Sequence, residues 1–179
     1  MHSELDILGM VSDRLEQQGI PFMLTGSYAL AYYAIPRMTR DLDLVVALKA
    51  SEVEKLIAAF AADFYLDADA VREAVRTSRM FNMMHLASGI KVDMIVKKAT
   101  AYRDLEFSRR KSVALDRVST WLVSREDLIL SKLAWARDSG SELQLRDVRA
   151  LLTDTVDQDY LKRWAQELEV SHLLERLTS

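Results

Sequence analysis

The amino-acid sequence predicts an α+β protein in which a mixed β-sheet is flanked by helices and followed by a helical C-terminal segment. Three observations carry this prediction. Up to residue 123, segments with a helical period alternate with short apolar runs of strand length. From residue 124 onward the apolar spacing is helical throughout. Half of the 179 residues are hydrophobic, so the chain can bury a core.

The first half of the chain alternates helix and strand. The segment 4–18 places its apolar residues on one helical face, and Gly19 ends it. Phe22 to Leu24 is a short apolar run before a glycine turn, which predicts a buried strand. Pro36 ends the next helical segment. The other elements expected here are a helix at 29–34, a strand at 42–46, and helices at 51–62 and 67–77.

The second half begins with strands and ends with helices. Apolar runs at 81–87 and 90–96 flank Ser88-Gly89, which predicts a β-hairpin. The charged segment 100–110 is ambiguous, whereas 113–123 is rich in Val and Thr and is expected to be extended. Helices are expected at 125–137, 144–153, 157–168 and 170–177. We therefore expect a core at 1–123 and a helical segment at 124–179 packed on it.

Composition excludes several classes of protein. The formal charge is −3, which argues against a general polyanion binder. The chain has no cysteine, which excludes disulfides and thiolate metal sites. No apolar run reaches the length of about 18 residues that a membrane helix needs, and no signal segment is recognised at the N-terminus. We expect a cytoplasmic protein that does not act on a membrane.

Three aspartates are the candidate metal ligands. Asp41 and Asp43 are two apart at the start of a strand, so their side chains face the same way and repel each other. Magnesium removes that repulsion because it takes oxygen ligands from one or two carboxylates and from phosphates. Asp93 interrupts another apolar strand, and three carboxylates that converge can hold two ions. The alternative is that Asp-x-Asp is a chance pattern and that Asp93 lies at a solvated edge.

The turn Gly26-Ser27 is the candidate phosphate site. It lies between a strand and a helix, where glycine lets the backbone approach a phosphate and the helix offers N–H groups. An ordinary turn in which Ser27 caps the helix is the alternative for this motif alone. The fixed order of a glycine turn, paired acids and a third acid favours the functional interpretation.

These motifs resemble those of the nucleotidyltransferase superfamily, often called polymerase-beta-like. The resemblance covers residues 20–97 and rests on Gly26-Ser27, on Thr39-Arg40-Asp41-Leu42-Asp43-Leu44, and on Val92-Asp93-Met94. It implies magnesium, or manganese in its place, held by the three aspartates, and a nucleoside triphosphate cradled by the glycine turn. Arg40 would neutralise phosphate charge or pair with Asp41.

The C-terminal segment resembles the AbiEii and MenT-type toxin branch of that superfamily. The motifs are residues 124–133, which include Lys132, and Arg146-Asp147-Val148. The resemblance implies that Lys132 reaches the triphosphate, that Asp147 supports the site, and that an antitoxin protein is a partner. If Lys132 reaches the triphosphate, Lys132→Ala is expected to weaken nucleotide binding and to leave the melting temperature nearly unchanged. The alternative is that Lys132 is only a surface lysine, in which case the nucleotide affinity would not change.

Two further features are open to more than one interpretation. Basic residues at 97–111, interleaved with Tyr102 and Phe107, are either an RNA-binding surface or a solvated face, and the acids among them favour the solvated face. Trp121, Trp135 and Trp164 are expected in the core or at a buried partner surface.

The sequence therefore predicts a metal-dependent nucleotidyltransferase, an enzyme that moves a nucleotidyl group from a nucleoside triphosphate to a hydroxyl of an RNA, a protein or a small molecule. A role as the toxin of a toxin–antitoxin system belongs to this prediction. The alternative is a non-catalytic relative that binds nucleotide or a protein partner.

Overall fold

The computed structural model describes residues 2–34 and 41–178. Arg40 lies outside these residues. The described elements are, in chain order, α1 (Glu4–Gln17), β1 (Phe22–Leu24), α2 (Gly26–Tyr33), β2 (Asp41–Val46), the short 3₁₀ turn η1 (Ala50–Glu52), α3 (Val53–Phe60), β3 (Phe64–Leu66), α4 (Ala68–Thr77), β4 (Met80–His85), β5 (Lys91–Val96), α5 (Ala101–Ser108), β6 (Lys111–Leu115), β7 (Val118–Leu122), α6 (Arg125–Ser139), α7 (Glu142–Leu151), α8 (Gln158–Glu167) and α9 (Ser171–Thr178).

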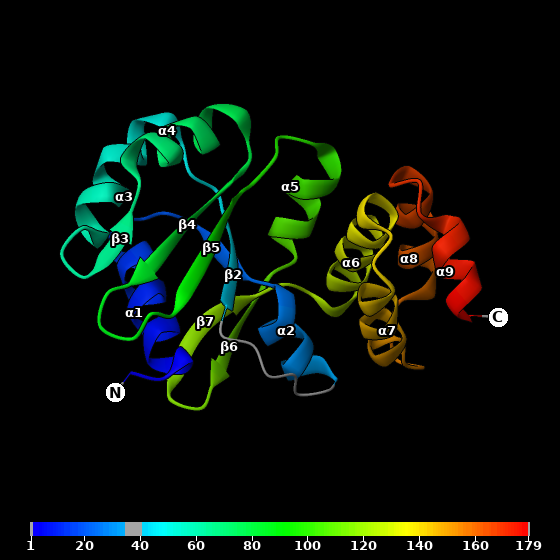
Figure 1. The fold of residues 1–179 in the computed structure, drawn as a ribbon. Helices are drawn as coiled ribbons and strands as arrows, with labels where there is room; N and C mark the ends of the chain where they lie inside the picture. Colours follow the sequence, from blue (N-terminus) through cyan, green and yellow to red (C-terminus); the bar gives the residue numbers. More distant parts are fainter. Residues whose placement is uncertain (1, 35–40, 179) are drawn as a thin grey trace.

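The strands within the described residues form one mixed sheet in the order β3-β4-β5-β2-β1-β7-β6 (Figure 1). The pairs β2–β5 and β1–β7 are parallel, and the other neighbouring pairs are antiparallel. The predicted hairpin is confirmed as β4–β5, and the predicted α+β class is confirmed as well. The parallel pairing of β2 with β5 positions the site, because it brings together two segments about fifty residues apart in sequence.

One face of the sheet carries the hydrophobic core. Alternate residues of β2 and β5 are fully buried there, and helices α1, α3 and α4 lie over this face (Figure 1). Leu44 is a typical member, because it pairs with Leu24 of β1 on one side and with Met94 of β5 on the other. The alternation of side chains along a strand then sends the intervening residues, the aspartates among them, to the opposite face.

The C-terminal helices α6 to α9 pack together beside the sheet (Figure 1). Helix α6 begins at Ser124, whose hydroxyl accepts a hydrogen bond from the backbone N–H of Asp127, as a helix cap does. It ends at Gly140, which adopts a left-handed conformation with φ of 68°. Contacts with α2 and hydrogen bonds with α5 hold α6 against the rest of the chain.

Several local expectations needed correction. The ambiguous segment 100–110 forms α5, and the extended segment 113–123 is a hairpin that turns at Asp116, with φ of 53°. Strand β3 was not expected, because its three residues have no turn signal beside them like the Gly26-Ser27 that follows β1. Trp135 is 56% exposed, so it does not lie in the core, and its other expected place, at a partner surface, stays a prediction. Among the described residues, no helix is long and apolar enough to cross a membrane.

Candidate active site

The three candidate metal ligands lie on one face of the sheet. Asp43 pairs directly with Asp93 across the parallel β2–β5 ladder, and Asp41 pairs with Lys91 in the same register. Directly paired residues, and residues two apart on a strand, share a face. The side chains of Asp41, Asp43 and Asp93 therefore extend from the same side of the sheet, opposite the core.

Lys91 is a cation inside this group that the sequence analysis did not single out. Its Nζ lies 3.0 Å from Oδ2 of Asp93 and 3.6 Å from Oδ2 of Asp41. Within the residues that the structure describes, no three Asp, Glu, His or Cys side chains are arranged to hold one ion as they stand. The ammonium of Lys91 explains why the three aspartates do not form such a group, because it lies between the carboxylates of Asp93 and Asp41.

The glycine of the predicted phosphate turn packs directly on Asp43. Gly26 begins α2 with φ of 64°, a left-handed conformation that glycine adopts without strain. A Cβ at this position would lie 2.7 Å from Cγ of Asp43 and closer still to Oδ2. The backbone N–H of Thr25 also donates to the main-chain oxygen of Asp43, at 2.9 Å. The turn therefore packs against the Asp43 side chain so closely that only glycine has room at position 26. Ser27 lies in the first turn of α2.

The environment of these carboxylates fits a divalent cation. Burial raises the pKa of Asp43, and the neighbouring charges of Asp93 and Asp41 raise it further, against the opposing effect of Lys132 and Lys91. Asp93 is nearly buried, and its Oδ1 has no hydrogen-bond partner in the part of the chain that the structure describes. A buried carboxylate oxygen without a partner is costly, and an oxygen-seeking ion would satisfy it.

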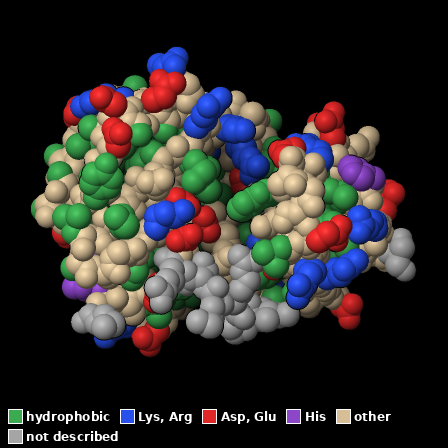
Figure 2. All heavy atoms as spheres, in the orientation of Figure 1, with side chains coloured by type: hydrophobic (Ala, Val, Ile, Leu, Met, Phe, Trp, Pro, Cys, Tyr) green, Lys and Arg blue, Asp and Glu red, His purple; other side chains and the backbone are tan. Residues whose placement is uncertain are grey.

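A cleft of about 240 Å³ opens beside Asp43, between the sheet face and helices α5 and α6. Gly26 and Asp43 lie at its wall, and Lys132 and Trp135 of α6 line it from the other side. Figure 2 shows Lys and Arg side chains along the upper part of the hollow between the sheet and the C-terminal helices. Lys97, Lys98 and Arg103 line the cleft in addition to Lys132.

Lys132 reaches this cleft as one partner of a buried ion pair. Its Nζ lies 2.7 Å from Oδ2 of Asp147 and donates to Oε1 of Gln144 at 3.0 Å. Lys132 is only 4% exposed and Asp147 only 7%. The alternative of an ordinary surface lysine is therefore wrong, because the side chain is buried and its ammonium lies against Gln144 and Asp147 of α7. The direct contact between Lys132 and Asp147 was not expected, and the predicted roles of the two residues toward a triphosphate stay predictions.

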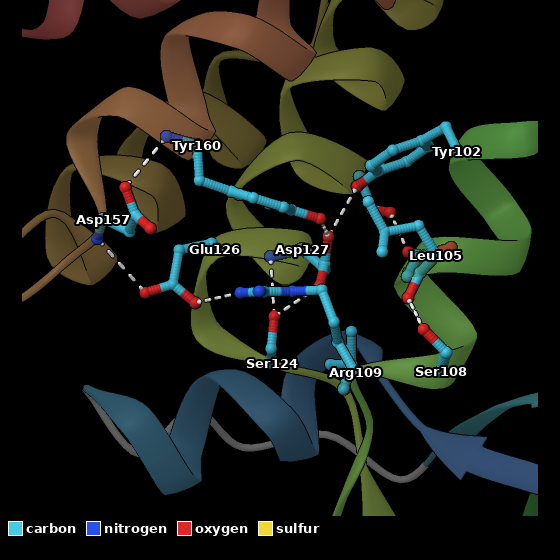
Figure 3. Close-up of polar contacts among 12 residues, drawn as sticks. Tyr102, Leu105, Ser108, Arg109, Ser124, Glu126, Asp127, Asp157 and Tyr160 are labelled. Atoms are coloured by element: carbon cyan, nitrogen blue, oxygen red, sulfur yellow. Dashed lines mark hydrogen bonds and ion pairs between the residues drawn. The ribbon is translucent and has the colours of Figure 1, made fainter.

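A second buried carboxylate, Asp127, joins the sheet part to the C-terminal helices (Figure 3). Its side chain is fully buried and accepts hydrogen bonds from Tyr160 Oη at 2.6 Å, Tyr102 Oη at 3.3 Å and Arg109 Nε at 3.0 Å. Ser124 Oγ lies 2.5 Å from Oδ2, the oxygen that Arg109 also contacts, whereas both tyrosines donate to Oδ1. These partners come from α5, α6 and α8, so the contact fixes the wall of the cleft and explains why Arg109 of the basic stretch is not a free nucleic-acid contact.

Lys91 also provides a test of this site. Lys91→Met keeps the aliphatic stem and removes the ammonium that lies against Asp93 and Asp41. We expect the variant to bind Mn²⁺ up to about fivefold more tightly without nucleotide, the upper end of the range that a partly screened ion pair spans. Titration calorimetry measures the change, with Lys111→Met on the exposed edge strand β6 as the control. Weaker or unchanged Mn²⁺ binding in Lys91→Met would show that Lys91 does not compete for the carboxylates.

Solved structures similar to this chain belong to nucleotidyltransferase-like proteins. An antigenic nucleotidyltransferase-like protein from Paracoccidioides brasiliensis matches with a TM-score of 0.63 and 18% identity, over 97% of this chain and 87% of that chain. The antibiotic-resistance protein ANT(2'')-Ia, solved with adenylyl-2''-tobramycin, matches with a TM-score of 0.59 and 12% identity, over 98% and 99% of the two chains. A putative nucleotidyltransferase from Thermotoga maritima matches with a TM-score of 0.53 and 16% identity, over 91% and 92%.

No family model matches the chain, and no curated protein matches it in sequence. The structural likeness shows that the fold is nucleotidyltransferase-like. Identities of this size show the fold alone, so the chemistry has to be argued from the residues of the site.

Proposed function

We propose that this chain transfers a nucleotidyl group from a nucleoside triphosphate to an acceptor hydroxyl, with magnesium or manganese held by Asp41, Asp43 and Asp93. The observation that carries the proposal is the register of β2 with β5, which sets Asp43 opposite Asp93 and next to the glycine turn. The adenylylated antibiotic bound to ANT(2'')-Ia, a protein of the same fold, supports transfer of this kind.

The triphosphate is assigned to the turn and to the facing helix. Gly26 and Ser27 begin α2, where backbone N–H groups face outward and attract phosphate oxygens. Lys132 contributes positive charge from α6, and Asp147 is a positioning residue because it holds the Lys132 ammonium in place. Arg40, two residues before Leu42, remains a proposed phosphate ligand from the sequence motif.

The reaction forms a bond between the acceptor oxygen and the α-phosphorus and breaks the bond from that phosphorus to the pyrophosphate leaving group. Asp93 is the candidate base for the proton of the acceptor hydroxyl, since its Oδ1 has no partner among the described residues. Bound magnesium supplies the positive charge that neutralises the triphosphate and the leaving oxygen. Asp41 and Asp43 hold that charge in place.

The acceptor has an approach across the open part of the same sheet face. Met80 and Met84 of β4 lie on that side, in register with Ile95 and Lys91 of β5, and both are exposed. The acceptor remains an RNA, a protein or a small molecule, and a toxin paired with an antitoxin protein, as in the AbiEii and MenT branch, stays a prediction.

Label transfer tests the proposal. The purified protein is incubated with magnesium, cellular RNA and protein, and a nucleoside triphosphate labelled at either the α- or the γ-phosphate. We expect the acceptor to be labelled only by the α-labelled nucleotide. Asp93→Asn should lose this labelling, whereas the control Asp69→Asn, which changes an exposed acid of α4, should label the acceptor as the wild type does. Labelling from the γ-phosphate would indicate phosphoryl transfer instead. Nucleotide binding without any transfer would favour the non-catalytic alternative.

A further inference from the structure

Helix α6 presents one stripe of side chains to the cleft. Leu128, Ser131, Lys132 and Trp135 all line it, and their spacing of three, four and seven residues places them on one helical face. Lys132 is buried in its ion pair, whereas Trp135 is 56% exposed. The indole of Trp135 therefore lies on the wall of the cleft with more than half of its surface accessible to a ligand.

The order of the lining residues along α6 indicates which end of the cleft Trp135 occupies. Lys132 and Asp43 line the same cleft from opposite walls, so Lys132 marks the charged end of the cleft. At the other end of α6, Arg137 and then Lys98 lower the pKa of Asp138, so that end lies near Lys98. Trp135 lies between these points, three residues and about 4.5 Å along the helix from Lys132.

The facing wall is apolar at the same end of the cleft. Val45 and Ile95 each lie two residues beyond an aspartate on their strands, on the same sheet face, and they pair with each other in the β2–β5 register. Both line the cleft together with Trp135. The cleft therefore has a charged end at Asp43 and Lys132, and an apolar end with Val45 and Ile95 on one wall and an indole on the other.

We propose that Trp135 binds the nucleobase of the nucleoside triphosphate, by stacking its ring on the base while the phosphates lie at Asp43 and Lys132. This inference rests on the proposed function. A flat aromatic base can stack on an exposed indole whatever the identity of the base. The opposite face of the base suits the apolar wall, because the face of an aromatic ring has no hydrogen-bonding group. A divalent cation held by the carboxylates would keep the triphosphate at the opposite end.

Two probes separate the base from the phosphates. Magnesium tripolyphosphate carries the charge of the substrate without a base, and a magnesium nucleoside triphosphate with a non-hydrolysable α,β bond carries both. Titration calorimetry of both probes is compared in the wild type, in Trp135→Leu and in Trp135→Phe. Tyr65→Leu is the matched control, because Tyr65 is a 62% exposed aromatic residue of β3 that does not line the cleft.

We expect Trp135→Leu to bind the nucleoside triphosphate about 5- to 150-fold more weakly and to bind tripolyphosphate as the wild type does. Trp135→Phe keeps an aromatic ring and should lose less affinity for the nucleoside triphosphate than Trp135→Leu. Tyr65→Leu should bind it as the wild type does. Equal losses for both probes, or an unchanged affinity for the nucleoside triphosphate in Trp135→Leu, would overturn the role of Trp135. A wild type that binds neither probe would overturn the proposed function itself, and the inference with it.

Discussion

Asp43→Asn is expected to abolish nucleotidyl transfer while making the metal-free protein more stable. Removal of one group that holds charge at a reaction centre costs about 10²- to 10³-fold in rate, and Asp43 lies against the glycine turn where the triphosphate is assigned. Burial, Asp93 and Asp41 raise the pKa of Asp43, so its ionised form destabilises the folded state. Asparagine keeps the shape and removes the charge, which should add on the order of 1 kcal/mol at neutral pH.

The sign of the pH dependence follows from the direction of that shift. A carboxyl whose pKa is higher in the folded state makes its most favourable contribution below its ordinary value near 3.8, and that contribution falls as the pH rises above it. The stability advantage of Asp43→Asn without metal should therefore grow from pH 4 toward neutrality. Excess magnesium should reverse the order, because binding to the native state stabilises the wild type more than the variant.

Thermal and denaturant unfolding of both proteins, with magnesium and with a chelator, measures these differences. Asp69→Asn on α4 is the control for removal of an exposed acid. Equal destabilisation of Asp43→Asn under both conditions would show that Asp43 supports the fold rather than a metal.

Lys132→Met is expected to be among the most destabilising single changes in the C-terminal helices. It removes the ammonium that offsets Asp147 in a buried pair, and breaking such a pair from one side costs about 3–5 kcal/mol. Replacement of both partners, in Lys132→Met with Asp147→Leu, should recover most of that loss, because the desolvation penalty of both charges disappears.

The double variant separates stability from function. It should fold, yet bind magnesium tripolyphosphate more weakly than the wild type, since it lacks the positive charge that lines the cleft near Asp43. Denaturant unfolding measures the stability of each variant, and titration calorimetry measures its affinity for magnesium tripolyphosphate. A Lys132→Met protein as stable as the wild type would contradict the buried pair, and a double variant with wild-type affinity would restrict Lys132 to a structural role.

Most elements of the fold follow from local sequence patterns. The C-terminal helices, the β4–β5 hairpin and the strand that begins at Asp41 have clear periods, turns or caps, and the structure confirms them. The order of the strands does not follow from such patterns. The sequence indicates that Asp43 and Asp93 each lie on a strand, but only the long-range parallel pairing of β2 with β5 sets them side by side.

The sequence analysis missed several features of the site, each for a different physical reason. Lys91 was accessible to the same rule that identified Asp41 and Asp43, because it lies two residues before Asp93 and therefore on its face. The different burial of Lys132 and Trp135 could not be predicted from their spacing, since both lie on one face of α6. Only the packing of α6 against its neighbours buries Lys132 and leaves Trp135 exposed. Asp127 resembled a simple helix-start acid, and its partners Tyr102 and Tyr160 come from distant helices.

The central claim is that the carboxylates of β2 and β5 hold a divalent cation for a nucleoside triphosphate. Electron paramagnetic resonance of Mn²⁺ tests it most directly, because bound and free ion give different signals. The wild type, Asp43→Asn and Asp93→Asn are titrated with Mn²⁺ in the presence of a non-hydrolysable nucleoside triphosphate. We expect saturable binding by the wild type and a loss of about tenfold or more in either variant. Equal Mn²⁺ binding by all three proteins would contradict the claim.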